Sequence, residues 1–282
     1  MTRRRLVPKP WRCTCLSALL AAAVPIAAAL PIALPAKASE AWPGIRAEVF
    51  GARPIHDGGG LVTLKAPYRP DDVRSVPLEA EARLTDGRTV TSVTFIVDEN
   101  PSPVAAVFRL GGARDRVALA TNIRLNQQSD VRVIVEASDG ELLMAEQLVK
   151  FAGGQASCSA PPVGDPKVIA ATMGRMEFAA VGAKAASSHA VERARVALSH
   201  PNHTGMVLDP ITLLYIPLLM VDRIEARQGG ELVFEMTGSI TLAQNPAVEF
   251  DFVTNGAGEM TVSAGDTSGA SWEQRFPIGP AS

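Results

Sequence analysis

The sequence predicts an all-β protein with two β-sandwich domains joined by a short linker. Short segments rich in apolar and β-branched residues follow one another along the chain, with turn residues between them. A predicted linker, 153–166, divides these segments into two groups, and its residues 153–162 are mostly small or helix-breaking. The 244 residues that follow position 38 are long for one sandwich and comfortable for two.

Residues 1–38 predict a signal peptide. Basic residues from Arg3 to Arg12, with no acidic residue among them, precede an apolar stretch, 16–34, and Ala36-Lys37-Ala38 matches a signal-peptidase site. The run Thr2–Val7 resembles a twin-arginine export signal, although the general secretion route also fits. An uncleaved membrane anchor is the alternative, which the prolines of this segment disfavour. We therefore expect a periplasmic protein.

Removal of the signal peptide changes the charge of the chain. It leaves 21 basic and 29 acidic residues, a net charge of −8. Such a surface repels nucleic acid and anionic lipid, so neither is expected as a partner. The longest later apolar run, Ile211–Val221, is too short to span a membrane and contains Pro217.

The cysteine count singles out one residue. Cys13 and Cys15 leave with the signal peptide, so Cys158 is the single cysteine of the mature chain. In an oxidising compartment an odd cysteine is buried, bonded to another molecule, or a working thiol. It lies in the predicted linker, whose Gly153 and Gly154 give backbone freedom.

The first group of segments predicts a sandwich over residues 39–152. Alternation is clear at Val131, Val133 and Val135, and Asp86-Gly87 and Asp139-Gly140 are suited to tight hairpins. Seven strands at this spacing are typical of an immunoglobulin-like sandwich. The predicted strands are Leu61–Lys65, Val76–Leu84, Thr89–Val97, Val104–Leu110, Arg116–Leu125, Asp130–Ala137 and Glu141–Phe151.

The second group predicts another sandwich over residues 167–282. Gln228-Gly229-Gly230, Asn255-Gly256 and Ser268-Gly269 are its turns. The Ala-rich stretch Lys167–Ala190 is compatible with helix, strand or loop. The predicted strands are Ala194–Ser199, Val221–Arg227, Glu231–Thr237, Val248–Val253, Glu259–Ser263 and Ser271–Phe276.

Other constellations favour structural roles. His200 and His203 have the spacing of a metal pair, but no further ligand completes a site, so a turn is expected. His56 beside Asp57 is compatible with acid–base chemistry and better explained as an exposed turn. The run 58–60 lacks the strand-then-helix context of a phosphate loop. We predict no catalytic residue, no metal site and no cofactor.

The order of short motifs resembles a known pair of families. The first half is similar to SoxY, the sulfur-carrying subunit of bacterial thiosulfate oxidation, and the second half is similar to its partner SoxZ. The SoxY-like motifs are Ile96–Pro103, Val104–Phe108, Thr121–Leu125 and Val133–Gly154. The SoxZ-like motifs are His200-Pro201, Thr204-Gly205, Tyr215-Ile216-Pro217, Ile224-Glu225, Leu232–Phe234 and Asn245-Pro246.

The resemblance implies a carrier built from two paired immunoglobulin-like sandwiches. The most similar type is the single-chain SoxYZ-like carrier associated with quinoprotein (PQQ-dependent) dehydrogenases. In SoxY a GGCGG tail holds the substrate covalently on its cysteine while partner enzymes act on it. Here Gln155–Ser157 separates Gly153 and Gly154 from Cys158, and the arm continues into the second domain instead of ending.

These features predict a covalent carrier thiol at Cys158 on a flexible arm. The slim neighbours of Cys158 predict exposure rather than burial, and the arm from Lys150 to Cys158 reaches roughly 25–30 Å when extended. The thiolate would hold a sulfur species and present it to periplasmic Sox-type, quinoprotein or cytochrome redox enzymes. An inert or intermolecularly bonded cysteine is the alternative at this residue.

Two other function classes compete with the carrier. One is an adaptor that binds a quinoprotein dehydrogenase or its cytochrome without a covalent cargo. The other is an enzyme, which no motif supports. We also expect the two domains to pair within one chain, because the linker holds them at a high local concentration.

Overall fold

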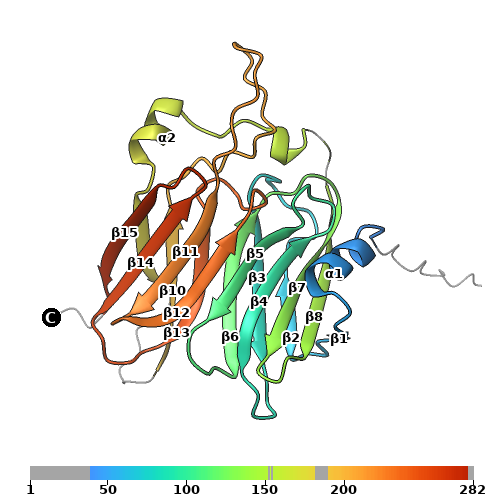
Figure 1. The fold of residues 1–282 in the computed structure, drawn as a ribbon, viewed down its shortest axis with the longest axis vertical. Helices are drawn as coiled ribbons and strands as arrows, with labels where there is room; N and C mark the ends of the chain where they lie inside the picture. Colours follow the sequence, from blue (N-terminus) through green and yellow to red (C-terminus); the bar gives the residue numbers. More distant parts are fainter. Residues whose placement is uncertain (1–38, 152, 154, 182–189, 279–282) are drawn as a thin grey trace, which may run out of the picture. The chain divides into compact units, whose positions relative to one another are not determined.

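The computed structural model describes residues 39–151, 153, 155–181 and 190–278. The predicted signal peptide lies outside these residues. Strands dominate the described part (Figure 1). The helices are α1 (Trp42–Phe50), a 3-10 turn (Ser157–Ser159) and α2 (Pro166–Thr172). The strands are β1 (Ile55–Asp57), β2 (Val62–Lys65), β3 (Val76–Arg83), β4 (Val90–Val97), β5 (Val104–Leu110), β6 (Arg116–Ile123), β7 (Ser129–Ala137), β8 (Leu142–Val149), β9 (Met176–Val181), β10 (Val191–Leu198), β11 (Val221–Gln228), β12 (Glu231–Gly238), β13 (Ala247–Val253), β14 (Glu259–Asp266) and β15 (Ser271–Pro277).

The strands form two sheets that pack face to face. One sheet has nine strands in the order β1-β8-β7-β4-β5-β12-β11-β14-β15, and the other has six in the order β2-β3-β6-β13-β10-β9. Neighbours are antiparallel except β1 and β8. Every predicted strand is present, with ends that shift by a few residues. The all-β prediction with a sandwich in each half is therefore confirmed.

The two halves share both sheets. Strand β5 of the first half pairs with β12 of the second, where Phe108 faces Met236, and β6 pairs with β13 in the other sheet. At this seam a Cβ on Gly111 would lie 1.8 Å from the carbonyl oxygen of Leu232, so the close approach requires glycine. The halves are thus joined edge to edge by backbone hydrogen bonds as well as by the linker.

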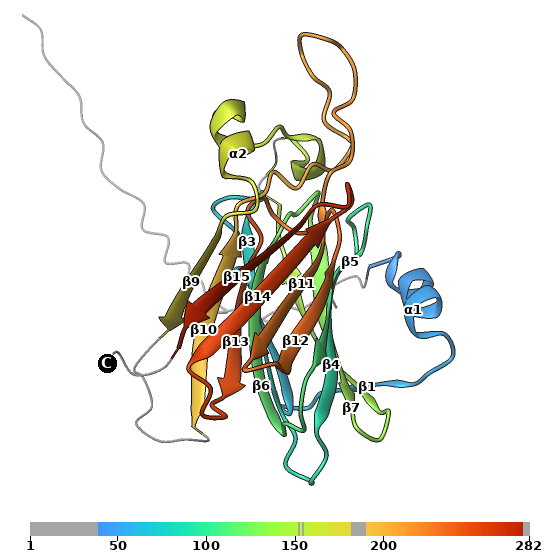
Figure 2. The ribbon, with the colours of Figure 1, turned by 60° about the vertical axis from the view of Figure 1, so that its left-hand side comes forward.

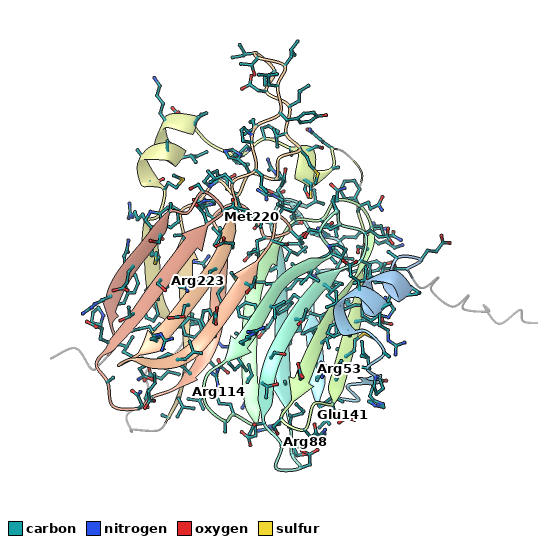
Figure 3. The ribbon with its side chains drawn as sticks, in the orientation of Figure 1. Arg53, Arg88, Arg114, Glu141, Met220 and Arg223 are labelled. Carbon is teal, nitrogen blue, oxygen red and sulfur yellow. The ribbon has the colours of Figure 1, made fainter. Side chains whose placement is uncertain are left out.

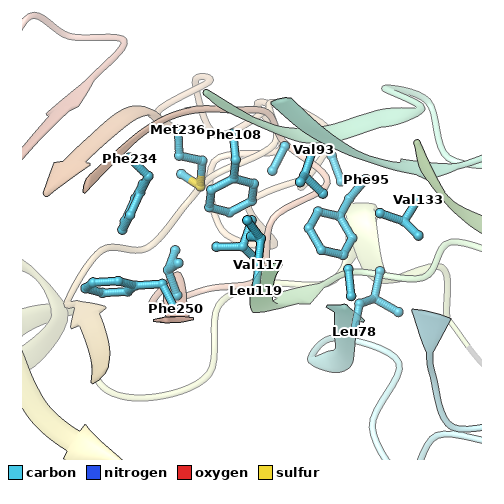
Figure 4. Close-up of a cluster of buried hydrophobic side chains, with 14 of the residues drawn as sticks. Leu78, Val93, Phe95, Phe108, Val117, Leu119, Val133, Phe234, Met236 and Phe250 are labelled. Carbon is cyan, nitrogen blue, oxygen red and sulfur yellow. The ribbon is translucent and has the colours of Figure 1, made fainter. Parts of the chain in front are cut away.

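A continuous core fills the space between the sheets. Phe95 and Phe108 from the first half and Phe234 and Phe250 from the second form one row of aromatic rings (Figure 4). Successive ring centroids are 5.9, 5.7 and 4.8 Å apart. Because side chains alternate along each strand, these apolar residues all face inward. The core therefore crosses the seam without interruption.

Helix α1 covers the outer face of the nine-stranded sheet (Figure 2). Ile45 packs against Ile134 of β7, whose side chain points away from the main core. Arg132 on the same outer face is buried, donates to both carboxylate oxygens of Asp98 and lies 4.4 Å from the ring of Trp42. This helix accounts for the apolar and charged residues that interrupt the alternation of β7, and it is absent from the sequence-based prediction.

The uncertain stretch Lys167–Ala190 divides into three parts. Helix α2 starts at Pro166, with Asp165 as its N-cap, and β9 forms an edge strand of the six-stranded sheet. Residues 182–189 lie outside the described part of the chain. No helix among the described residues is long and apolar enough to cross a bilayer.

Candidate functional site

Three segments meet at the end of the sandwich where β6 and β10 finish. The first is Arg124–Asn126, directly after β6, and the second is the 3-10 turn Ser157–Ser159. The third, His200–Thr204, follows β10 and leads into a long hairpin. Figure 1 shows the 3-10 turn, α2 and the hairpin at this same end of the strands. The predicted site residue Cys158 lies within this cluster.

Cys158 is buried, with 1% of its surface exposed. Its backbone N–H donates to Asn126 Oδ1 at 3.3 Å, and Thr204 Oγ1 donates to its carbonyl oxygen at 2.5 Å. The preceding Ser157 Oγ donates to the carbonyl of Leu125 at 2.8 Å. The turn is therefore fastened to both halves of the protein.

The prediction of an exposed thiol is wrong for this conformation. The residues next to Cys158 in the chain are small and offer no cover. Asn126 and Thr204, which contact Cys158, are distant in sequence and reach it because β6 and β10 end at the same edge of the sandwich. In the described residues Cys158 is a free thiol.

Burial raises the pKa of the Cys158 thiol, and the nearby Arg124 guanidinium and the Ser157 hydroxyl offset part of this rise. The thiol is therefore protonated at neutral pH in this conformation. Because the thiolate is the reactive form, the closed turn holds Cys158 in an unreactive state.

Arg124 is the cation of this site. Its side chain is buried, and Nη1 donates to the carbonyl oxygens of Asn202, Ile240 and Leu242 at 2.8, 3.2 and 3.0 Å. Within the described residues it forms no ion pair with a carboxylate. A buried guanidinium satisfied by neutral carbonyls retains its full charge, so it favours an anion at the neighbouring sulfur.

His200 has the structural role that the sequence indicates. It is buried, its Nδ1 accepts the N–H of Asn202 at 3.0 Å, and its Nε2 lies 3.3 Å from Asp266 Oδ2. Acceptance at Nδ1 requires a neutral ring that donates from Nε2. Burial lowers the pKa of His200, with Asp266 opposing the shift. His203 Nδ1 is buried without a hydrogen-bond partner in the structure, and burial lowers its pKa also.

The other candidates lie away from the thiol or take ordinary structural roles. Gly153 has a left-handed φ of 93°, as expected of a glycine before a turn, whereas Gly154 lies outside the described residues. His56 is exposed on β1, 3.9 Å from Glu141, and Asp57 accepts the N–H of Gly59. No cluster of three or more metal-ligating side chains occurs among the described residues.

Arg124 and Thr204 are the site residues that sequence reasoning missed. Both fall within motifs that carry the family resemblance, Thr121–Leu125 and Thr204-Gly205. Their position within these motifs is the signal that could have singled them out, but nothing in the sequence places either residue near Cys158.

Family models match both halves of the chain. The model of sulfur oxidation protein SoxY matches residues 46–155, and the model of sulphur oxidation protein SoxZ matches residues 181–277. The chain belongs to the SoxY/SoxZ family. It joins a SoxY half and a SoxZ half in one polypeptide, which confirms the predicted resemblance. Cys158 lies between the two matched ranges, three residues beyond the end of the SoxY match.

Solved structures show weaker similarities. The sulfur carrier protein SoxY from Chlorobium limicola f thiosulfatophilum is 23% identical, with a TM-score of 0.35, covering 39% of this chain and 91% of its own. A β-glycosidase from Bacteroides vulgatus is 9% identical, with a TM-score of 0.22, covering 77% of this chain and 24% of its own. The YadV chaperone is 13% identical, with a TM-score of 0.19, covering 77% of this chain and all of its own. A comparison with functionally curated proteins gave no significant match.

Proposed function

We propose that this protein is a periplasmic sulfur carrier that holds a sulfur-containing intermediate covalently on Cys158 and presents it to partner enzymes. Membership of the SoxY/SoxZ family supports a carrier role in sulfur oxidation. The single observation that carries the assignment to Cys158 is its position beside Arg124, a buried cation without a carboxylate partner in the described residues, at the seam between the two halves.

Loading requires the turn to open. Three hydrogen bonds hold the turn closed: Ser157 Oγ donates to Leu125, the N–H of Cys158 donates to Asn126, and Thr204 Oγ1 donates to Cys158. Each contributes about 1 kcal/mol to the free energy of opening. Local opening at this cost lies well below global unfolding and exposes the thiol to solvent and to a partner. Exposure also removes the burial that raises the pKa of Cys158, so more thiolate forms.

The loading step is thiol–disulfide exchange. The Cys158 thiolate attacks one sulfur of a donor that contains a sulfur–sulfur bond. One S–S bond forms to Cys158 and one breaks in the donor, whose other sulfur leaves as a thiolate. Electrons and charge balance without an external oxidant. When the turn closes again, the buried Arg124 guanidinium is near the loaded Cys158 and stabilises an anionic group on the bound sulfur species.

We propose redox enzymes of the periplasm as partners, of the Sox type or a quinoprotein dehydrogenase with its cytochrome. The resemblance to SoxYZ-like carriers of the quinoprotein-associated type supports the second class. The acidic mature sequence, with a net charge of −8, disfavours nucleic acid and anionic membranes.

Intact-mass spectrometry tests the proposal. The protein is isolated without reductant from cells that oxidise thiosulfate, and its mass is compared before and after reduction. We expect an added mass that reductant removes, absent from Cys158→Ser. A wild-type protein that never carries a reducible adduct, under conditions in which it is required for growth, overturns the carrier function.

The second candidate is an adaptor without covalent cargo, and burial of Cys158 favours it. Here the thiol is a packed small side chain. Cys158→Ser separates the two functions because serine preserves the size and the backbone hydrogen bonds. A carrier loses its contribution to sulfur oxidation in this variant, whereas an adaptor retains it.

A further inference from the structure

An apolar hairpin projects from the end of the sandwich that holds Cys158. Residues 207–216 form a ribbon in which the N–H of Ile216 donates to Val207 at 2.8 Å and Leu208 pairs with Tyr215. At its base the N–H of Leu219 donates to His203 at 3.1 Å. Figures 1 and 2 show the ribbon extending beyond both sheets, and Figure 3 places Met220 where it returns to them.

The tip of this hairpin exposes large apolar side chains. Their exposed fractions lie between 49% and 90%, with Ile211 the most exposed. Soluble proteins seldom leave such a group uncovered, because apolar surface in water is unfavourable and invites association. The six residues, called the hairpin tip below, are Leu208, Ile211, Leu213, Leu214, Tyr215 and Leu218.

The tip has a defined turn. Asp209 Oδ1 accepts the N–H groups of Ile211 and Thr212 at 2.8 Å each, and the N–H of Asp209 donates to Leu214 at 2.9 Å. Leu213 has a φ of 57°, a left-handed conformation that is unfavourable for leucine. Glycine or asparagine would adopt this conformation at lower cost. The local geometry alone therefore does not explain an exposed leucine at this position.

We propose that the hairpin tip is the docking site for the enzyme that exchanges sulfur with Cys158, and that this enzyme receives it in an apolar cleft. The connection between tip and thiol supports this. Thr204, two residues before Met206 where the hairpin begins, donates to the Cys158 carbonyl, and its Oγ1 also accepts the N–H of Met206. A partner held by the tip therefore lies at the end of the molecule where Cys158 emerges.

Charge and position argue for a protein rather than a membrane or a second copy. Between Met206 and Met220 the single charged residue is Asp209, whose carboxylate is engaged in the turn. Anionic membranes need basic residues beside the apolar anchor, and none is present in this segment. Tip-to-tip pairing of two copies, or insertion into lipid, would cover the end of the molecule from which Cys158 must emerge. The identity of the partner thus rests on the proposed carrier function.

Photo-crosslinking tests the proposal in cells that produce the full-length protein. Tyr215 is replaced by p-benzoylphenylalanine, and the matched control carries the same group at Val191, which is 60% exposed at the far end of β10. We expect the probe at position 215 to form an adduct with one other protein, identified by mass spectrometry, and the control not to form it. That protein is then purified as the binding probe.

Binding of the purified partner gives the quantitative test. The double variant Ile211→Ser/Leu214→Ser should bind it about thirtyfold or more weakly, as expected for loss of central apolar anchors, whereas Val191→Ser should bind normally. Both positions are exposed, so the melting temperature should not change. Equal binding by the double variant overturns the proposal.

Several other outcomes also overturn the docking proposal. One is an adduct to a second copy of the chain, to its residues 1–38 or to lipid, and another is the absence of any adduct. A third is flotation of the protein with phosphatidylcholine vesicles that is lost in the double variant. The carrier function fails separately. If the probe at position 215 crosslinks to the partner but Cys158 never carries a reducible mass, the carrier function is wrong and the docking proposal stands. If Cys158 carries a reducible mass but the probe forms no crosslink, the docking proposal is wrong and the carrier function stands.

Discussion

At the scale of single residues, the reactivity of Cys158 is set by opposing effects. Burial disfavours the thiolate, while Arg124 and Ser157 favour it, and the net effect is a raised pKa of the thiol. The hydrogen bonds that close the turn come from residues of both halves. The thiol is therefore kept buried by hydrogen bonds that are individually weak, and each of them can be tested separately by mutation.

Thr204→Val should increase the rate at which a thiol reagent labels Cys158. The variant removes the donor to the Cys158 carbonyl, which lowers the free energy of opening by about 1 kcal/mol and raises the labelling rate about fivefold. Stopped-flow or gel-based labelling of native protein measures this. Thr91→Val is the control, because Thr91 also donates to a backbone carbonyl but lies elsewhere. Equal acceleration in both variants contradicts a specific latch.

His200 should make the protein less stable in mild acid. Folding lowers the pKa of His200 from its ordinary value of 6.5. Above this pH the ring is neutral in both the folded and the unfolded protein, whereas below it the ring becomes protonated in the unfolded protein before it does in the folded protein. Stability is therefore complete above about pH 6.5 and is lost as the pH falls. The loss grows as the pH falls further, until the folded ring also binds the proton.

Urea unfolding of wild type and His200→Gln between pH 5 and 7.5 measures this contribution. Glutamine has one acceptor and one donor group to replace those of the ring, so it preserves polarity without titrating. The slope of stability against pH below 6.5 should be smaller in the variant. Some slope remains, because the pKa of His203 is lowered as well. Identical slopes would contradict the assignment.

At the scale of elements, α1 seals the outer face of the first half. Its Ile45 packs over Ile134, and Trp42 covers the buried Arg132–Asp98 pair. Without this cover the ion pair and several apolar side chains of β7 and its neighbours would face water. The helix, although short, therefore belongs to the folded unit.

Ile45→Ala should lower the free energy of unfolding by about 2 kcal/mol, because it removes buried methyl groups and leaves a cavity. Val49→Ala on the exposed side of the same helix should cost less than about 0.5 kcal/mol. Guanidinium unfolding of both variants measures the difference. Similar values for the two would show that α1 does not stabilise the sheet.

At the scale of the whole molecule, the SoxY and SoxZ halves form one structural unit. Strand pairing crosses the seam in both sheets, Arg114 of the SoxY half donates to the carbonyls of Asp251 and Val233 in the SoxZ half, and the aromatic row is continuous. Figure 3 places Arg114 at the end of the seam opposite Met220. Separating the halves would expose apolar surface along the entire seam.

The halves should unfold together. After residue 38 the sequence has one tryptophan in each half, Trp42 and Trp272, so in protein that starts at Ser39 the variants Trp272→Phe and Trp42→Phe leave a reporter for one half at a time. After correction for the effect of each variant on stability, the urea transitions seen by the two reporters should coincide with that seen by circular dichroism. Two resolved transitions would show that the seam does not couple the halves.

Much of the fold was predictable because strand patterns are local. Alternating valines and Asp-Gly turns mark strands and hairpins within a few residues, and each predicted strand is present. Helix α1 escaped prediction because its apolar residues do not form a marked stripe along one face. At β7, the alternation of Val131, Val133 and Val135 was predicted, but the cover over Arg132 and Ile134 was not, because it comes from a segment distant in sequence.

The sequence by itself determined the β class, the two-part organisation, the family and the choice of Cys158 as the thiol to test. The tertiary structure decided that the two sandwiches share both sheets, that Cys158 is buried and that Arg124 lies beside it. The physical reason is range: strand and turn propensities act between neighbours in the chain, whereas the burial and the electrostatic environment of Cys158 depend on residues such as Arg124 and Thr204 that only folding brings to it.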